Sequence, residues 1–266
     1  MLRKFHFHRF EFKYLVTPAQ ADEIHKELSF HMEPDPYAME NPDRSYQIRS
    51  LYFDNDSLDH YYEKMDGVKT RKKFRIRTYA NQPTKGLEVY FEIKRRKNGV
   101  IIKDRANVPY EMIRTFRFEN LLEFAGDKNF SSQKKSTLEE FLFDFYRLRM
   151  SPQVLISYTR TPLVDKITRK IRVTFDQDIR CLVTNDLFSA QRGRHVLAKH
   201  RVMEVKFSGS MPWWLHHVIQ KYEIGNEAIS KYCLGIETSG RETQKLVGHH
   251  RDYQWTVPST LIGVKQ

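Results

Sequence analysis

The sequence predicts a mostly antiparallel β protein with inserted helices, an α+β arrangement. Apolar and polar residues alternate in at least six segments, and this period of two is typical of half-buried strands. Asn98-Gly99 separates two strand-like runs within residues 91–105, and this dipeptide favours the tight turn of a β-hairpin. Helix-like periodicity is confined to three stretches. The clearest strand segments are residues 5–16, 72–80, 87–96, 154–164, 171–179 and 201–209.

The three helix segments carry start and stop signals. Residues 18–29 follow Thr17, a residue type that caps helix N-termini, and they begin with a proline. Residues 136–149 begin with a Ser-Thr pair followed three residues later by glutamate, which is the pattern of a capping box. Residues 212–224 also begin with a proline, and Gly225 is expected to end this helix.

Length and composition bound the class of protein. A chain of 266 residues lies within the range of one large barrel or sandwich, so we expect a single domain over residues 1–266, with 241–266 as a C-terminal arm or tail. The 45 Lys and Arg residues exceed the 33 Asp and Glu residues, which leaves a net charge of +12. Such an excess indicates an anionic partner, namely a polyanion, a membrane surface or an acidic ligand.

Cysteine use and hydropathy predict a soluble cytoplasmic protein. Cys181 and Cys233 lack the spacing of a metal-binding or redox motif, and we interpret them as buried thiols in a reducing compartment. No apolar run approaches the roughly 20 residues that span a bilayer. Residues 1–10 also lack the apolar stretch of a signal peptide.

The charged residues of the predicted strands gather on one face of each strand. Side chains i and i+2 of a strand point the same way, so Arg75 and Arg77 share a face opposite Phe74 and Ile76. Arginine is favoured where planar recognition of phosphate is needed. The residues grouped in this way are Arg9, Glu11 and Lys13; Arg71, Lys73, Arg75 and Arg77; Glu92, Lys94 and Arg96; Tyr158 and Arg160; Arg172 and Asp176; and Glu204 and Lys206.

These charged faces are either solvated or arranged around an anion. An ordinary sheet surface would explain any one strand, but solvated faces usually mix hydroxyl and amide residues with both signs of charge. If the faces curl inward, they line the lumen of a barrel with cations. Two like charges ~4 Å apart repel by about 4 kcal/mol at an effective dielectric constant of about 20, so such a lumen needs an anion. A chain of phosphates matches it in charge, width and acceptor groups.

Eight motifs occur in order along the chain. They are R-x-E-x-K at 9–13, RSLYFDN at 49–55, FRIRTY at 74–79, FEIKR at 91–95, SYTRTPL at 157–163, RVTFDQDI at 172–179, MEVKFSG at 203–209 and SKYCLG at 230–235. This set resembles the VTC domain, the polyphosphate polymerase branch of the triphosphate tunnel (CYTH-like) enzymes, over residues 5 to about 237. The resemblance implies an eight-stranded antiparallel β tunnel or barrel with peripheral helices, which binds a nucleoside triphosphate, a divalent metal and a phosphate chain.

The resemblance implies roles for individual residues. The catalytic cations, expected to clamp the triphosphate, are Arg75, Arg77, Lys94, Arg160 and Arg172. The further substrate-binding candidates are Lys13, Lys103, Tyr158, Lys206, Ser230 and Lys231. Glu204 resembles the carboxylate that holds the metal, and Glu11 either shares this role or pairs with a neighbouring arginine.

Two departures limit this transfer of roles. The hydrolytic and cyclase branches carry E-x-E-x-K on the first strand, but Arg9 stands here in place of the first glutamate. This removes a metal ligand and weakens a hydrolase interpretation. The VTC pattern often has another basic residue ahead of Ser230, where this chain has Ala228 and Ile229, so its hold on the product chain is expected to differ.

The resemblance implies a polyphosphate polymerase that transfers the terminal phosphate of ATP to a growing chain, with Mn²⁺ or Mg²⁺ as cofactor. The expected partners are ATP, inorganic phosphate and polyphosphate, without DNA. Fungal relatives act in a membrane complex, which suggests a membrane-associated partner protein. Two alternatives stay open: a triphosphatase or polyphosphatase of the same fold, and a noncatalytic polyphosphate- or RNA-binding module. Neither a P-loop nor a dinucleotide-binding glycine motif occurs.

Several other residues receive structural interpretations. His6 and His8 share a strand face but lack a third ligand, so surface histidines are favoured. Asp54 is interpreted as a turn and cap residue. Trp213 and Trp214 are interpreted as helix-packing residues, with base stacking as an alternative for Trp213.

Overall fold

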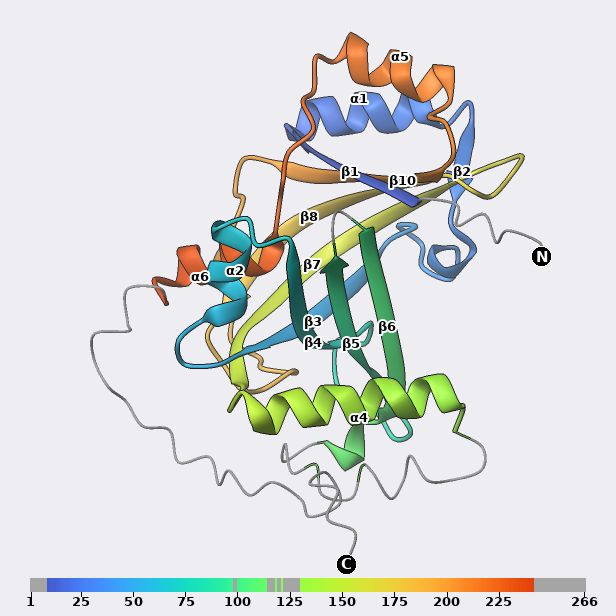
Figure 1. The fold of residues 1–266 in the computed structure, drawn as a ribbon. Coiled ribbons are helices and arrows are strands. Elements are labelled where there is room, and N and C mark those ends of the chain that lie inside the picture. The colour runs from blue at the N-terminus through green and yellow to red at the C-terminus, as the bar shows by residue number, and fades with distance from the viewer. Residues whose placement is uncertain (1–8, 98–99, 114–117, 119–120, 122–129, 242–266) are drawn as a thin grey trace, which may run out of the picture. The chain divides into compact units, whose positions relative to one another are not determined.

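The computed structural model describes residues 9–97, 100–113, 118, 121 and 130–241 and has an α+β fold (Figure 1). A large antiparallel sheet with peripheral helices confirms the predicted fold class. The strands are β1 (Arg9–Val16), β2 (Met32–Pro34), β3 (Tyr46–Asp54), β4 (Thr70–Thr78), β5 (Glu88–Lys97), β6 (Val100–Pro109), β7 (Ser151–Asp165), β8 (Arg172–Leu182), β9 (Arg194–His195) and β10 (Arg201–Ser208).

The helices connect the strands and cover parts of the sheet. In the described part of the chain, none of them is long and apolar enough to cross a membrane. The α-helices are α1 (Pro18–Leu28), α2 (Asp59–Met65), α4 (Ser132–Arg147), α5 (Trp213–Lys221) and α6 (Lys231–Ser239), and the 3-10 helices are η1 (Pro36–Ala38) and η2 (Tyr110–Met112).

The strands follow one hydrogen-bonded path. Its order is β1-β10-β8-β7-β3-β4-β5-β6, with β2 paired to β7 and β9 paired to β8. Within the described residues, eight strands therefore lie on the path, in agreement with the number that the resemblance implies. Closure of this path into a tunnel stays a prediction.

The chain divides into two compact units. The first comprises Met1–Ile48, Ser157–Arg180 and His195–Lys231, and the second comprises Arg49–Ile156, Cys181–Arg194 and Tyr232–Gln266. Strands β3, β7 and β8 contribute residues to both units. The single domain expected over the whole chain stays a prediction.

In the first unit, α1 and α5 lie side by side and pack on the apolar face of β1, β8 and β10 (Figure 1). Thr17 starts α1 as predicted, because its hydroxyl accepts a hydrogen bond from the Gln20 N–H while the Gln20 side chain accepts one from the Thr17 N–H. Each large apolar side chain that is fully buried here stabilises the fold by roughly 1.5–3 kcal/mol. This core comprises Tyr14, Val16, Ala21, Ile24, Leu28, Met32, Leu163, Ile171, Val173, Phe175, Met203, Val205, Phe207, Leu215 and Val218.

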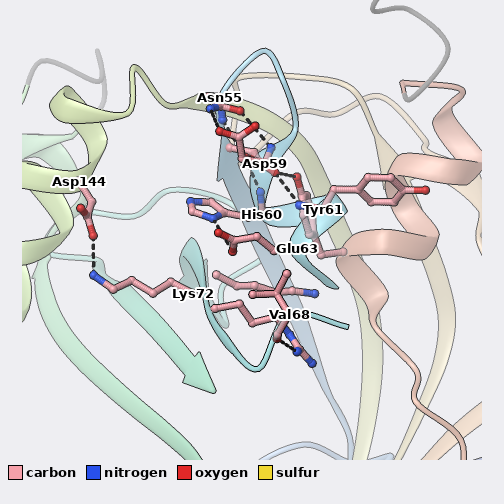
Figure 2. Close-up of polar contacts among 12 residues, drawn as sticks. Asn55, Asp59, His60, Tyr61, Glu63, Val68, Lys72 and Asp144 are labelled. Atoms are coloured by element: carbon pink, nitrogen blue, oxygen red, sulfur yellow. Dashed lines mark hydrogen bonds and ion pairs between the residues drawn. The ribbon is translucent and has the colours of Figure 1, made fainter. Parts of the chain in front are cut away.

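In the second unit, α4 lies across β5 and β6 (Figure 1). The alternation predicted from the sequence holds, because Phe74 and Phe91 are buried in the core formed with α4. Their rings meet Phe141 of α4 edge-on, with ring centroids 5.4 and 4.8 Å apart. Lys72 lies on the same side of its strand and reaches the Asp144 carboxylate of α4 at 2.7 Å (Figure 2).

Helix α2 is anchored at its N-terminus by the residues just before it (Figure 2). The buried Asp54 carboxylate accepts hydrogen bonds from the backbone N–H groups of His60 and Tyr61 at 3.1 and 3.0 Å. The Asn55 side chain accepts one from the Asp59 N–H at 3.1 Å and donates one to the Asp59 carboxylate at 2.6 Å. Asp54 therefore satisfies two first-turn N–H groups of α2 from outside the N-cap position, which Leu58 occupies.

The predicted start of the second helix is wrong. This helix, predicted over residues 136–149, begins at Ser132. The Ser131 hydroxyl accepts a hydrogen bond from the Lys134 N–H and caps the helix at that point. The first turn is largely exposed and carries no apolar periodicity, so the sequence pattern did not extend to it.

The start of α5 agrees with prediction, but its end and one of its side chains do not. The helix ends at Lys221 rather than just before Gly225, because Glu223 takes a left-handed backbone conformation with φ of 50°. Trp214 packs against the core as predicted. Trp213 is 76% exposed, so its interpretation as a packing residue is wrong, because the first residue of α5 faces away from the core.

Some predicted features lie outside the described residues. These are His6, His8, the turn residues 98–99 and the arm over 242–266. On either side of the turn, Lys97 pairs with Val100, so β5 and β6 form the predicted hairpin. Cys181 and Cys233 are buried thiols, as predicted.

Candidate functional site

A lateral row of polar side chains crosses four strands of the second unit. Strand register places Tyr52 of β3, Arg75 of β4, Glu92 of β5 and Arg105 of β6 side by side. Arg75 donates hydrogen bonds to Glu92 Oε2 at 2.6 Å and to the Tyr52 hydroxyl at 2.8 Å. Arg105 donates to Glu92 Oε1 at 2.8 Å. Each oxygen of Glu92 is therefore held by a guanidinium group.

Two more cations reach Glu92 from adjacent positions. Lys103 Nζ lies 2.6 Å from Glu92 Oε1, and Arg77 Nε lies 3.9 Å from Glu92 Oε2. Arg77 also donates to the Ser50 hydroxyl at 3.0 Å, which fixes its guanidinium group. We define the Glu92 cluster as Arg75, Arg77, Glu92, Lys103 and Arg105.

Three lysines form a row beside the Glu92 cluster. Lys73 of β4 pairs in register with Lys94 of β5, and Lys94 pairs with Lys103 of β6. Like charges directly opposite one another destabilise a sheet. This row therefore adds positive charge to a face that already carries the guanidinium groups of the cluster.

Charge in the Glu92 cluster is unbalanced. The Glu92 side chain is 1% exposed, and burial alone would raise its pKa. The four surrounding cations instead hold the pKa of Glu92 well below its usual range, so the group is a carboxylate. Four positive charges thus surround one negative charge. Guanidinium groups in such excess suit a ligand with several anionic oxygens.

Lys103 is the member of the Glu92 cluster that titrates near neutral pH. Burial lowers its pKa, Glu92 opposes this effect, and the guanidinium groups of Arg75, Arg77 and Arg105 bring the pKa of Lys103 to about 7. The Lys103 side chain is still 39% exposed, so an incoming anion can reach its amine.

A second group of alternating charges lies on β1 and β10 in the first unit. Strand register places Lys13 opposite Glu204, and Glu11 opposite Lys206. Lys13 Nζ lies 3.3 Å from the Glu11 carboxylate and 3.9 Å from that of Glu204. Lys206 forms an ion pair with Glu204 and lies 3.9 Å from Glu11. Each carboxylate is therefore shared by both lysines.

Asp176 of β8 is fully buried and binds two cations. Arg160 of β7 donates to both of its oxygens, at 2.6 and 2.8 Å, and Lys231 Nζ lies 2.6 Å from Oδ2. The ring of Tyr158 contacts both cations, with its centroid 5.5 Å from the Arg160 guanidinium and 4.9 Å from Lys231 Nζ. We define the Glu204 cluster as Glu11, Lys13, Arg160, Asp176, Glu204, Lys206 and Lys231.

Asp176 and Glu204 are held as carboxylates. Burial would raise both pKa values, but Arg160 and Lys231 lower the pKa of Asp176. The lysines of β1 and β10 hold the pKa of Glu204 well below its usual range. Three carboxylates and four cations make this cluster nearly neutral, in contrast to the Glu92 cluster.

Thr174 of β8 has a buried hydroxyl. It lies directly opposite Glu204 in the sheet and is 3% exposed. In the part of the chain that the structure describes, its Oγ1 makes no hydrogen bond. Leaving a buried hydroxyl unpaired costs roughly 1–3 kcal/mol. Thr174 lies between Arg172 and Asp176 on one face of β8.

The family model of the VTC domain matches residues 8–239 of the chain, a range that contains both clusters. The chain belongs to the VTC domain family. The match confirms the resemblance inferred from the eight sequence motifs. No curated protein sequence matches the chain.

Comparison with solved structures gives matches for this VTC domain, among them two proposed cyclases. HpAC1 from Hippeastrum, a proposed adenylyl cyclase described as having a dominant triphosphatase activity, is 11% identical with a TM-score of 0.50, over 86% of this chain and 95% of that chain. A proposed adenylate cyclase from Bacillus halodurans is 12% identical with a TM-score of 0.45, over 84% of this chain and 95% of that chain. At 11% identity, the likeness to HpAC1 establishes a CYTH-like fold alone.

The VTC domain brings most of the predicted site residues into the two clusters. The Glu92 cluster contains Arg75, Arg77 and Lys103, with Lys94 beside it. The Glu204 cluster contains Glu11, Lys13, Arg160, Glu204, Lys206 and Lys231, with Tyr158 against it. Arg172 lies opposite Lys206 in the sheet, but its guanidinium group pairs with Asp35 at 3.0 Å. Ser230 lies just before α6 and is half-buried.

Sequence reasoning placed Glu92 and Asp176 on charged strand faces but gave neither a role in the site. Arg105 and Thr174 were absent from the predicted site, although Arg105 follows Lys103 and Thr174 follows Arg172 on the same strand face. Extending the alternation by one position from each of these two predicted cations would have identified both.

Enzymes of the CYTH-like fold are generally metal-dependent, and two carboxylates of the Glu204 cluster are the candidates here for binding a divalent metal. Within the described ranges, no group of three His, Cys, Asp or Glu side chains suited to hold a metal occurs. Mg²⁺, however, usually binds through one or two carboxylates together with substrate phosphates and waters. Glu204 and Glu11 supply two carboxylates, and the buried hydroxyl of Thr174 adds an oxygen beside Glu204.

Proposed function

We propose that this VTC domain is a polyphosphate polymerase, which transfers the terminal phosphate of ATP to the end of a polyphosphate chain or to inorganic phosphate. The observation that carries the proposal is the Glu92 cluster, in which four cations surround one carboxylate. Phosphoryl transfer depends on positioning and on neutralising charge more than on covalent chemistry. A set of guanidinium groups fixed by strand register meets both needs.

In the second unit, Arg75, Arg77, Lys94 and Lys103 would bind phosphoryl oxygens. The hydroxyl partners of Arg75 and Arg77 hold both guanidinium groups in place before a ligand arrives. Incoming phosphate would compete with Glu92 for the same donors. Binding therefore replaces one set of charge-assisted hydrogen bonds by another without rearrangement of the strands.

In the first unit, the cations would bind phosphoryl oxygens from a more rigid arrangement. Arg160 and Lys231 are fixed by the buried Asp176, and Arg172 keeps 37% of its side chain exposed for a ligand. Arg172 is thus the more accessible of these cations. The further binding residues proposed here are Lys13, Lys206 and the hydroxyl groups of Tyr158 and Ser230.

Glu204, with Glu11 as a second carboxylate, would hold Mn²⁺ or Mg²⁺. When bound, the metal supplies positive charge to the phosphate oxygens of ATP. Lys13 and Lys206 keep Glu204 ionised by lowering its pKa, so its oxygens are ready to bind a hard cation.

Water as the phosphoryl acceptor is the second candidate, which would make the domain a triphosphatase or polyphosphatase. The likeness of its fold to HpAC1, described as having a dominant triphosphatase activity, favours this alternative. Arg9, which stands where the hydrolytic branch carries a glutamate, favours the polymerase. A noncatalytic polyphosphate- or RNA-binding module would use the same cations but would not turn over ATP.

Incubating the intact protein with ATP and Mn²⁺, and staining a gel of the products for polyphosphate, separates these functions. The polymerase yields long chains, the hydrolase yields orthophosphate alone, and the binding module yields neither. Arg77→Ala and Lys94→Ala should each lower chain synthesis by roughly 10²–10³-fold without unfolding the protein. Lys135→Ala, which changes a lysine of α4 that is 46% exposed, is the matched control and should leave synthesis unchanged. Orthophosphate as the sole product would contradict the polymerase.

A further inference from the structure

Three large apolar side chains protrude from neighbouring segments of the first unit. Phe30 follows α1, Ile167 lies between β7 and β8, and Trp213 begins α5. Their exposed fractions are 75%, 89% and 76%, the highest of any large apolar residue in the described ranges. We call these three residues the apolar tip. An exposed cluster of this kind marks a site of interaction more often than a chance surface.

Backbone and ring contacts hold the segments of the apolar tip together. The Lys166 N–H donates to the His31 carbonyl at 3.1 Å, and the Lys166 ammonium donates to the Phe30 carbonyl at 3.2 Å. The His31 ring stacks on Trp214 with centroids 4.8 Å apart and meets Trp213 edge-on at 6.0 Å. The apolar tip is therefore fixed by the fold.

The turn that carries Ile167 is basic as well as ordered. The Asp165 carboxylate accepts hydrogen bonds from the two N–H groups of residues 167 and 168, at 3.3 and 2.8 Å. Lys166, Arg169 and Lys170 flank Ile167, and all three are exposed. The most exposed apolar residue of the tip is thus surrounded in sequence by positive charge.

A groove of about 520 Å³ is lined by residues of α1 and α5 and by Phe30 and Trp213 of the apolar tip. Aromatic rings, Phe30 and Trp213 among them, line it together with charged side chains. Of these charged groups, Lys221 pairs with Glu27 at 2.7 Å, while Lys26 is exposed. The groove therefore combines apolar rings with two lysines and the two glutamates Glu23 and Glu27, and the excess positive charge near the tip comes from the turn that carries Ile167.

We propose that the apolar tip inserts into a membrane surface that carries anionic headgroups. Trp side chains favour the interface between lipid and water, and exposed Phe and Ile side chains gain free energy when they leave water there. The basic residues beside Ile167 would meet the negative headgroups of such a surface. The net charge of +12 acts in the same direction. This association is separate from the proposed transfer of phosphate.

Co-sedimentation of the intact protein with vesicles of phosphatidylcholine and phosphatidylserine tests the proposal. The protein should bind these vesicles, and it should bind phosphatidylcholine alone much more weakly. Combining Phe30→Ser, Ile167→Ser and Trp213→Ser should lower the partition coefficient by more than about tenfold. Lys170→Ala alone should lower it by roughly fivefold at low salt. Polyphosphate synthesis in solution should be unchanged in both variants.

The matched control combines Met65→Ser, Val100→Ser and Phe143→Ser, three exposed apolar residues of the second unit, and should bind vesicles like the intact protein. If the tip variant fails to fold, Ile167→Ser alone gives the same readout, because its side chain is 89% exposed. Absence of vesicle binding by the intact protein, or equal loss in the control, would overturn the proposal. A dimer in size-exclusion chromatography that the tip variant abolishes, without vesicle binding, would assign the tip to a second copy instead.

Discussion

The Glu92 cluster and the Glu204 cluster are built from the same residue types but differ in charge balance. Four cations surround one carboxylate in the Glu92 cluster. Four cations meet three carboxylates in the Glu204 cluster. The Glu92 cluster therefore has positive charge available for a ligand, whereas the Glu204 cluster largely neutralises itself. Both clusters have four cations, so the number of carboxylates decides the difference. The single carboxylate of the Glu92 cluster leaves cations available for phosphate, whereas the three carboxylates of the Glu204 cluster pair with its cations.

Burial reinforces this difference. In the Glu92 cluster, Lys103 and Arg105 keep 39% and 37% of their side chains exposed. In the Glu204 cluster, Arg160 and Lys231 are only 11% and 10% exposed. Charges that are removed from water need partners within the protein, because an unpaired buried charge is strongly destabilising. The buried Arg160 and Lys231 must therefore be paired with Asp176, while the more exposed Lys103 and Arg105 can await an anion.

Asp176→Ala should have the largest effect, because it removes the partner of two buried cations. Breaking a buried ion pair from one side costs about 3–5 kcal/mol of unfolding free energy. Urea unfolding followed by fluorescence measures this loss. Asp178→Asn is the matched control on the same strand, since this side chain is 52% exposed, asparagine tolerates the left-handed backbone of this residue (φ 50°), and loss of the charge should cost less than about 1 kcal/mol. Equal losses in the two variants would contradict the self-neutralising description of the Glu204 cluster.

Glu92→Gln should strengthen ligand binding in the Glu92 cluster, whereas Asp176→Ala weakens the fold. The substitution keeps the shape of the side chain but removes the negative charge that competes with phosphate for the same guanidinium groups. Affinity for tripolyphosphate should rise by about tenfold. This gain is a modest part of the interaction energy of two unit charges ~4 Å apart, which is roughly 4 kcal/mol at an effective dielectric constant of about 20. Isothermal titration calorimetry at low salt measures the affinity.

In the absence of ligand, Glu92→Gln should lower the free energy of unfolding, because the cations of the cluster then repel one another. Added tripolyphosphate should restore it, since a ligand that binds the folded state stabilises that state by mass action. Unchanged or weaker affinity of Glu92→Gln would show that the cations of this cluster do not meet the phosphates, and it would remove the contrast between the clusters.

Strand alternation made much of both clusters predictable. Because successive side chains of a strand point to opposite faces, Arg75 and Arg77 could be separated from Phe74 and Phe91 without any coordinates. The pairing of strands could not be obtained in this way. Whether Glu92 faces Arg105 depends on the register between β5 and β6, which strand alternation alone does not specify.

The remaining differences between the prediction and the structure come from contacts between residues that are distant in the sequence. Lys231 binds Asp176 and Lys13 binds the Ile229 carbonyl at 3.0 Å, although these partners are far apart in sequence. The exposure of Trp213 likewise depends on how α5 is seated, which its own sequence pattern does not specify. Local periodicity predicts which face a side chain takes, whereas tertiary packing decides which partner it meets.

Lys103 should make tripolyphosphate binding depend on pH, which is the smallest effect expected here. Its amine must carry a proton to attract phosphate, and its pKa of about 7 in the free protein should rise when an anion binds. Binding should therefore be strongest below pH 7 and weaken as the pH rises through 7 towards the pKa of the bound state. Since the side chain is 39% exposed, solvent screening limits the fall to about threefold to tenfold between pH 6.5 and pH 9. Titration calorimetry at several pH values measures it, and Lys103→Arg should abolish the dependence because arginine stays charged. A dependence that persists in Lys103→Arg would assign the titration to another group.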